Sequence, residues 1–213
     1  MTANVDVPIP DGYIVPSGTK EITENGTFDV TVYDSVNVNV STGGGDSEEF
    51  SAFLENTLQV LDNSSVTTLR TRVCQAATKL TTVNLPNVTT LGAYAFYQCS
   101  NLKTVTLPKL TTISTQTWYM CQTLERADCG QLGNVSAQTF ASCAALKTLI
   151  LRKTSDICTL SNANGVSGSG IGKGTGYVYV PSALIDTYKT ATNWSTYADQ
   201  FRAIEDYPEI CGG

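Results

Sequence analysis

Apolar residues recur through the middle of the chain at intervals of 22 positions. Three sets of equivalent positions carry the signal: Leu80, Leu102, Leu124 and Leu146; Val83, Val105, Ala127 and Leu149; and Leu85, Leu107, Cys129 and Leu151. A fixed period of this length is the signature of a repeat architecture. The register defines four units, residues 65–86, 87–108, 109–130 and 131–152, followed by a longer fifth unit, residues 153–181.

The spacing within a unit predicts one short buried strand. In residues 102–107, apolar side chains alternate around Val105, so every second side chain faces the interior. One such strand cannot bury its own face, whereas stacked units can, with neighbouring strands about 4.8 Å apart. The pattern therefore predicts a solenoid of short parallel strands over residues 64–181.

Two further equivalent positions are expected to fill the interior. One holds Cys74, Phe96, Trp118 and Phe140, and the other holds Ala77, Cys99, Cys121 and Cys143. The fifth unit is longer because of a glycine-rich stretch, residues 162–176, which we interpret as a flexible loop because glycine loses the most backbone entropy on ordering.

A solenoid exposes its core at both ends, so capping segments are expected. Residues 48–63 have the apolar spacing of an amphipathic helix, with Ser47 as its N-cap. Residues 182–207 are also amphipathic and predict a C-terminal helical cap, followed by a tail, residues 208–213. Ahead of the first cap, residues 1–41 predict a small β-arm with a hairpin turn at Asn25-Gly26, and residues 42–47 a glycine-rich linker.

The stretch Val88 to Pro108, VTTLGAYAFYQCSNLKTVTLP, resembles the BspA-type bacterial leucine-rich repeat, whose units read roughly VTxIGxxAFxxCxxLxxIxLP. The resemblance covers residues 64–181. Gly130 and Arg152 depart from it, because they replace the proline that closes a unit. The resemblance implies a leucine-rich-repeat solenoid of the α+β class, with helical caps and the N-terminal β-arm as additions.

Composition narrows the possible chemistry. The chain has no histidine, which excludes Ser-His-Asp and Cys-His catalysis and histidine-containing zinc sites. We predict no catalytic residue, no cofactor and no metal, and we interpret the cysteine row as buried structural side chains. The motif around Lys173 lacks the first glycine and the final Ser/Thr of a phosphate loop. A net charge of -6 argues against nucleic acid, and no apolar stretch is long enough to insert into a membrane.

The outward-facing side chains of the predicted strands are the candidate binding face. They form two rows: Thr82, Thr104, Arg126, Thr148 and Tyr177; and Asn84, Thr106, Asp128, Ile150 and Tyr179. Threonine rows are also what β-propensity selects on a solvated sheet, so that reading stays open. Arg126, Asp128, Tyr177 and Tyr179 are the less routine members, and we predict that they bind a protein or a surface glycan.

Repeats of this type resemble those of cell-surface adhesins and phage virion proteins, which implies a non-enzymatic binding or structural role. Residues 16–30 also resemble short β-modules of virion proteins from phages of gut bacteria. The start of the chain shows no secretion signal, which favours a virion component in a tail, baseplate or head decoration over a bacterial surface adhesin. The arm, residues 1–41, is the candidate contact for a second copy of the chain or for an assembly partner.

Overall fold

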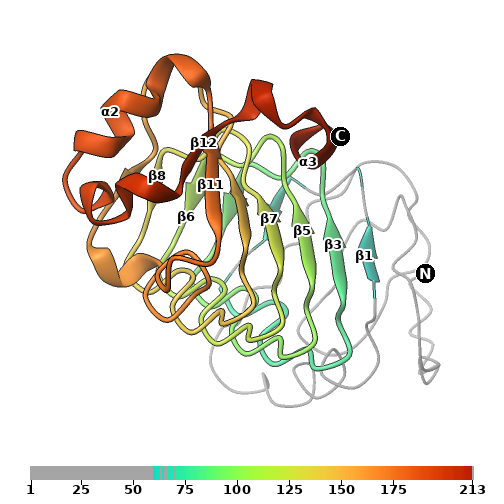
Figure 1. Cartoon of the computed structure of the whole chain (residues 1–213). Helices are drawn as coiled ribbons and strands as arrows, with labels where there is room; N and C mark the ends of the chain where they lie inside the picture. Colours follow the sequence, from blue (N-terminus) through green and yellow to red (C-terminus); the bar gives the residue numbers. More distant parts are fainter. Residues whose placement is uncertain (1–59, 63, 65–66, 70, 213) are drawn as a thin grey trace, which may run out of the picture.

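The computed structural model describes residues 60–62, 64, 67–69 and 71–212. In this part of the chain, successive units stack as the coils of a solenoid with two walls of short parallel strands (Figure 1). The predicted β-arm, linker and the first part of the predicted N-terminal helix, residues 1–59, lie outside the described residues.

The first wall is one parallel sheet of seven strands, which we call the first sheet. Its strands, in spatial order, are β1 (Val60–Asp62), β3 (Thr82–Asn84), β5 (Thr104–Thr106), β7 (Arg126–Asp128), β9 (Thr148–Ile150), β11 (Tyr177–Val180) and β12 (Phe201–Ala203). Val83 pairs with Val105, and Val105 pairs with Ala127. The predicted 22-residue register is therefore confirmed.

Strand β1 shows that residues 60–62, at the end of the helix predicted over residues 48–63, form a strand; residues 48–59 lie outside the described residues. Leu61 pairs with Val83 and is buried, so it takes the place of the central apolar residue of a further unit. Over a few residues, the spacing of apolar side chains is compatible with either a helix or a strand. The open hydrogen-bonding edge of β3 decides between them, because pairing with β3 satisfies the backbone of residues 60–62.

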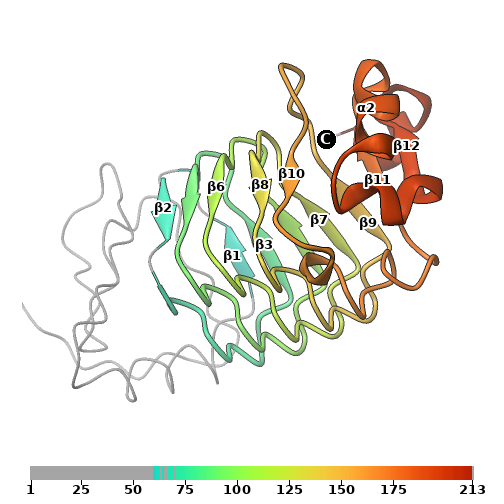
Figure 2. The same cartoon turned by 90° about the vertical axis from the view of Figure 1, so that its left-hand side faces the viewer.

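The second wall consists of strands of two residues each (Figure 2). β2 (Thr68–Leu69), β4 (Thr90–Leu91) and β6 (Thr112–Ile113) form a three-stranded sheet, and β8 (Asn134–Val135) pairs with β10 (Thr159–Leu160). In each strand the second residue is buried and the first lies at the surface. The two walls therefore enclose one continuous core.

Aromatic side chains from three successive units stack in the middle of that core. The Trp118 ring lies 6.2 Å from that of Phe96 and 5.0 Å from that of Phe140, with interplanar angles of 2° and 4°. All three residues are fully buried. Such stacked pairs each contribute about 0.5–1.5 kcal/mol beyond the burial of their area, so this column ties neighbouring units together.

The glycine-rich stretch of the fifth unit is packed, contrary to the flexible loop predicted from its composition. It contains the 3₁₀ turn η1 (Ala163–Gly165), and its backbone accepts hydrogen bonds from the N–H groups of Phe140 and Ser142 at 2.8 and 2.9 Å. A Cβ on Gly170 would lie 2.3 Å from the carbonyl oxygen of Leu146. Glycine serves here to let two backbones approach closely.

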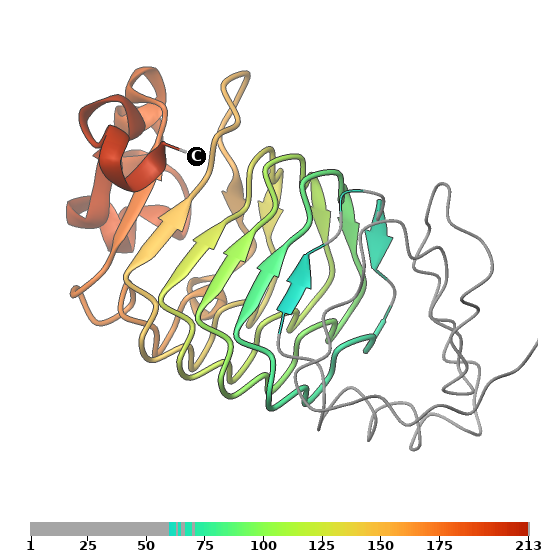
Figure 3. The ribbon, with the colours of Figure 1, turned by 90° about the vertical axis from the view of Figure 1, so that its right-hand side faces the viewer.

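The C-terminal cap closes one end of the stack (Figure 3). It comprises η2 (Ser182–Leu184), α2 (Ile185–Thr190), η3 (Trp194–Gln200), strand β12 and η4 (Ile204–Asp206). The Trp194 Nε1 group donates to the carbonyl of Cys158 at 2.6 Å, and the Cys158 N–H donates to the Tyr188 hydroxyl at 2.7 Å. The predicted cap is therefore present, and it includes the strand β12 in addition to helices. The predicted tail contains the short helix α3 (Pro208–Cys211).

Candidate binding face of the first sheet

The outer face of the first sheet carries the two predicted rows of side chains. The central residue of each strand, such as Val83 or Val105, is buried, so the residues on either side of it point outward. Parallel pairing aligns Thr104 with Arg126, and Thr106 with Asp128. The sheet thus brings the four predicted binding residues onto one face, spread over β7 and β11.

Part of this face is covered by the C-terminal residues of the chain. Residues 204–212, which we call the C-terminal segment, cross the outer face over β7, β9 and β11 (Figure 1). Asp128 keeps only 3% of its surface exposed and Tyr179 only 4%, while Ile150 is fully buried. These three residues form what we call the covered face. The prediction that Asp128 and Tyr179 are exposed is therefore wrong.

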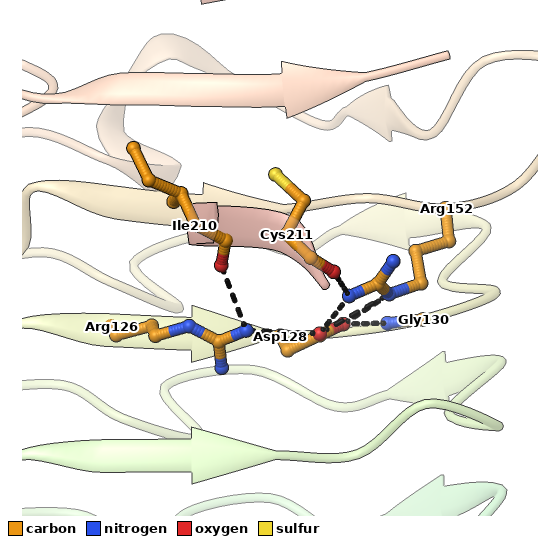
Figure 4. Close-up of polar contacts among 6 residues, drawn as sticks. All are labelled: Arg126, Asp128, Gly130, Arg152, Ile210 and Cys211. Atoms are coloured by element: carbon orange, nitrogen blue, oxygen red, sulfur yellow. Dashed lines mark hydrogen bonds and ion pairs between the residues drawn. The ribbon is translucent and has the colours of Figure 1, made fainter. Parts of the chain in front are cut away.

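Asp128 lies at the centre of a polar cluster beneath the C-terminal segment (Figure 4). The Arg152 guanidinium binds both carboxylate oxygens of Asp128, with Nη2 2.6 Å from Oδ2 and Nε 3.1 Å from Oδ1. Nη2 of Arg126 lies 3.4 Å from the same Oδ2 atom. The hydrogen bond to Asp128 raises the pKa of Arg152. The buried carboxylate is therefore paired with two cations.

The same two arginines hold the C-terminal segment in place. Nη2 of Arg152 donates to the carbonyl of Cys211 at 2.5 Å, and Nη2 of Arg126 lies 3.4 Å from the carbonyl oxygen of Ile210. On the apolar side, the Tyr179 and Tyr207 rings meet edge to face, with their centres 5.4 Å apart. Arg126 thus contacts the C-terminal segment directly, and Asp128 is linked to it through the two arginines.

At position 130 the repeat has glycine in place of its closing proline, and the backbone geometry there requires glycine. It adopts a φ of +32°, and a Cβ there would lie 1.9 Å from the carbonyl oxygen of Pro108. Its N–H lies 3.4 Å from Oδ1 of Asp128. The other departure, Arg152, supplies the main cation of the cluster. Arg152 therefore contacts the C-terminal segment, and Gly130 lies beside the Asp128 carboxylate that Arg152 binds.

Tyr177 remains accessible at the edge of this region, with 38% of its surface exposed. The Arg202 guanidinium lies over its ring, 4.1 Å from the ring centre, and Nη1 of Arg202 donates to the carbonyl of Phe201 at 2.7 Å. This arrangement stacks a cation over an aromatic ring at the last two strands of the sheet, β11 and β12. Of the four predicted residues, Tyr177 and the half-buried Arg126 can still reach a partner.

Among the described residues, no segment covers the outer face over β1, β3 and β5. We call this region the open face; its outward side chains, all at least partly exposed, are Val60, Asp62, Thr82, Asn84, Thr104 and Thr106. The Asn84 Nδ2 group donates to Oδ1 of Asp62 at 3.0 Å. The open face is uncharged apart from Asp62 and offers hydroxyl and amide groups at the regular spacing of the strands.

A second accessible cluster was not predicted from the sequence. Tyr94, Tyr97 and Tyr119 lie on the turns between the two walls, with the rings of Tyr97 and Tyr119 stacked 5.7 Å apart. Arg72 lies 5.1 Å from the centre of the Tyr94 ring. Tyr97 and Tyr119 occupy equivalent positions in the 22-residue register, so the repeat alignment contained the signal for this stack.

The cysteine row is part of the core. The thiols of Cys99, Cys121 and Cys143 each donate to a backbone carbonyl of the preceding unit at 3.0 Å. Burial raises the pKa of these thiols, to about 12 for Cys143, which opposes the thiolate form that metals require. Among the described residues, no group of three or more potential metal-ligating side chains comes together.

The Lys173 loop likewise lacks the chemistry of a phosphate site. Its backbone N–H groups are used within the loop: Gly172 donates to Oγ of Ser169 at 3.1 Å, and Lys173 donates to the carbonyl of Ser169 at 3.0 Å. A phosphate loop needs such groups free to face the ligand.

None of the helices in the described part of the chain has the length and apolar character that a membrane crossing requires.

The geometry defines a class of protein, a leucine-rich-repeat solenoid with a sheet face available to a partner. The family model for the BspA type leucine rich repeat region matches residues 49–163 in six copies. The chain therefore belongs to this family. The match begins ahead of the units first identified, in agreement with strand β1. Repeats of this kind generally form non-enzymatic scaffolds that bind proteins.

Among solved structures, the chain is similar to a leucine-rich repeat protein from Bacteroides ovatus ATCC 8483, with 14% sequence identity and a TM-score of 0.36. The alignment covers 89% of this chain and 53% of that protein, so the chain spans about half the length of this relative. No curated protein matches the chain.

Proposed function

We propose that this protein is a phage virion component, in a tail, baseplate or head decoration, that mediates attachment or assembly through protein or glycan contacts. The observation that carries the binding role is the open face, where hydroxyl and amide groups on β3 and β5 and the carboxylate of Asp62 on β1 are left uncovered by the C-terminal segment. Support for the virion comes from the resemblance of residues 16–30 to virion β-modules.

The alternative is a bacterial cell-surface adhesin or host-interaction protein of the same repeat family. The match to the BspA type leucine rich repeat region is compatible with this alternative. Electron microscopy with an antibody against the protein separates the two. Labelling of purified phage particles supports the virion role, whereas labelling of intact bacterial cells in the absence of particles supports the adhesin and contradicts the virion role.

Binding through the open face is tested by two matched substitutions. Thr104→Arg places a large cation in the middle of the open face, and Thr112→Arg places the same side chain at an exposed position of the second wall. We expect Thr104→Arg to weaken retention on host cells or on a glycan array at least tenfold, about 1.4 kcal/mol, with an unchanged melting temperature. Thr112→Arg should bind as the parent does. Equal binding by both variants would remove the open face from the proposal.

The predicted ligand residues now separate into two groups. Tyr177→Ala removes an exposed ring and is expected to weaken binding by about 2 kcal/mol if this edge takes part in recognition. Tyr179→Ala removes a buried ring that packs against Tyr207, so we expect it to loosen the C-terminal segment first.

Deletion of residues 1–41 tests the proposed anchoring arm, because it should release the protein from its assembly while preserving the melting transition.

A further inference from the structure

The covered face and the C-terminal segment form a small hydrophobic cluster of their own. Ile150, Tyr179 and Cys211 are its buried members, with Ile204, Tyr207 and Ile210 packed against them. This cluster is separate from the main core between the two walls. Its apolar contacts therefore join the segment to the outer face alone, and the interior of the solenoid takes no part.

The floor of this cluster is complete without the segment. Strands β7, β9 and β11 pair with one another in register, and the segment adds no strand to them. Asp128 holds the Arg152 guanidinium from below through both carboxylate oxygens. Asp128 therefore positions the main cation from within the sheet, and the three paired strands form the floor of the site.

The polar contacts to the segment involve only its backbone. Arg126 and Arg152 face the carbonyl oxygens of Ile210 and Cys211, the last residues of α3, where a helix leaves its carbonyls without internal partners. Because every residue has the same backbone carbonyl, these contacts do not select particular side chains. Any short helical turn with apolar side chains toward Ile150 and Tyr179 would make the same contacts.

We propose that the covered face is a peptide-recognition site that the C-terminal segment occupies as a built-in competitor. Its external ligand is a segment of a partner protein with the same chemistry: a short helical turn, apolar toward the sheet, with its final carbonyls toward Arg126 and Arg152. This inference concerns the covered face alone and does not depend on the partner of the open face.

The test uses the full chain with the substitution Ile210→Asp, which places a carboxylate in the apolar cluster and should release the segment. Release is measured by maleimide labelling of Cys211, which is buried in the parent protein. The binding probe is a fluorescent peptide with the sequence of residues 204–213 and serine in place of its cysteine. We expect the peptide to bind Ile210→Asp at least about tenfold more tightly than the parent, whose attached segment competes for the site.

Matched variants show whether the peptide occupies the proposed site. Arg126→Met in the Ile210→Asp background removes one carbonyl contact and should weaken peptide binding several-fold. Arg72→Met in the same background removes an arginine that lies over Tyr94, on the turns, and should have no effect. Thr82→Arg, on the open face and separated from β7 by β5, should also leave peptide binding unchanged, so the result is independent of the proposed attachment role.

Three outcomes would overturn the proposal. The first is a released variant that binds the peptide no better than the parent. The second is Cys211 labelling that stays slow in both Ile210→Asp and Tyr207→Asp, since the segment would then be a fixed part of the fold. The third is loss of the solenoid's melting transition in both variants, which would make the segment a requirement for folding.

Discussion

Replacing Trp118 by phenylalanine is expected to change the free energy of unfolding by no more than about 1 kcal/mol, although the side chain is fully buried. Its indole Nε1 group has no hydrogen-bond partner among the described residues. An unpaired buried donor costs about 1–3 kcal/mol, which the substitution recovers. The smaller ring gives up roughly 1–2 kcal/mol of packing, estimated from the larger cost of truncation to alanine. The two effects largely offset each other.

Trp194 provides a matched control, because it is also fully buried but its Nε1 group donates to the carbonyl of Cys158 at 2.6 Å. Trp194→Phe loses the same packing and, in addition, a hydrogen bond between buried groups. We therefore expect it to cost roughly 2–5 kcal/mol. One chemical change should thus give two clearly different losses of stability.

The assay is urea unfolding followed by far-UV circular dichroism, with the m-value checked to be constant between proteins. Trp118→Ala, which removes the ring from the aromatic column entirely, should cost about 3–5 kcal/mol and confirms that the position is core. A loss from Trp118→Phe equal to or larger than that from Trp194→Phe would refute the reasoning, since it would show that the unpaired indole carries no cost.

Further predictions concern local geometry, titration and reactivity. Gly130→Ala should destabilise by about 3 kcal/mol or more in urea unfolding, because its Cβ would meet the carbonyl of Pro108, whereas Gly133→Ala has room and should cost less than about 1 kcal/mol; equal losses would contradict the geometry. The Glu205 carboxylate accepts hydrogen bonds from the backbone N–H groups of Glu205 and Ser182, which lower the pKa of Glu205. The contribution of Glu205 to stability is therefore complete above the pKa of the unfolded chain and is lost as the pH falls through the pKa of the folded protein. Carboxyl NMR should show this lowered pKa, and Ser182→Pro should raise it. All seven cysteines are buried with raised thiol pKa values, so Ellman's reagent should react with them only on unfolding; rapid reaction of the native protein would contradict this.

The sequence alone determined the repeat, its register and the direction of its side chains. Val83, Val105, Ala127 and Leu149 were aligned by their spacing, and they are the buried centres of β3, β5, β7 and β9. This prediction succeeds because each unit contacts its immediate neighbours, so a period in the sequence maps directly onto a translation in space. The outward rows follow from the same alternation.

Only the tertiary structure decided which part of the outer face is free. Arg126 meets Ile210 across 84 positions of sequence, and Arg152 meets Cys211 across 59, with no periodicity to announce either contact. Gly130 and Arg152 were visible as departures from the repeat, yet the segment that Arg152 contacts was not. A repeat pattern specifies contacts between neighbouring units, whereas the docking of a chain end depends on the shape and charge of a surface that exists only after those units have stacked.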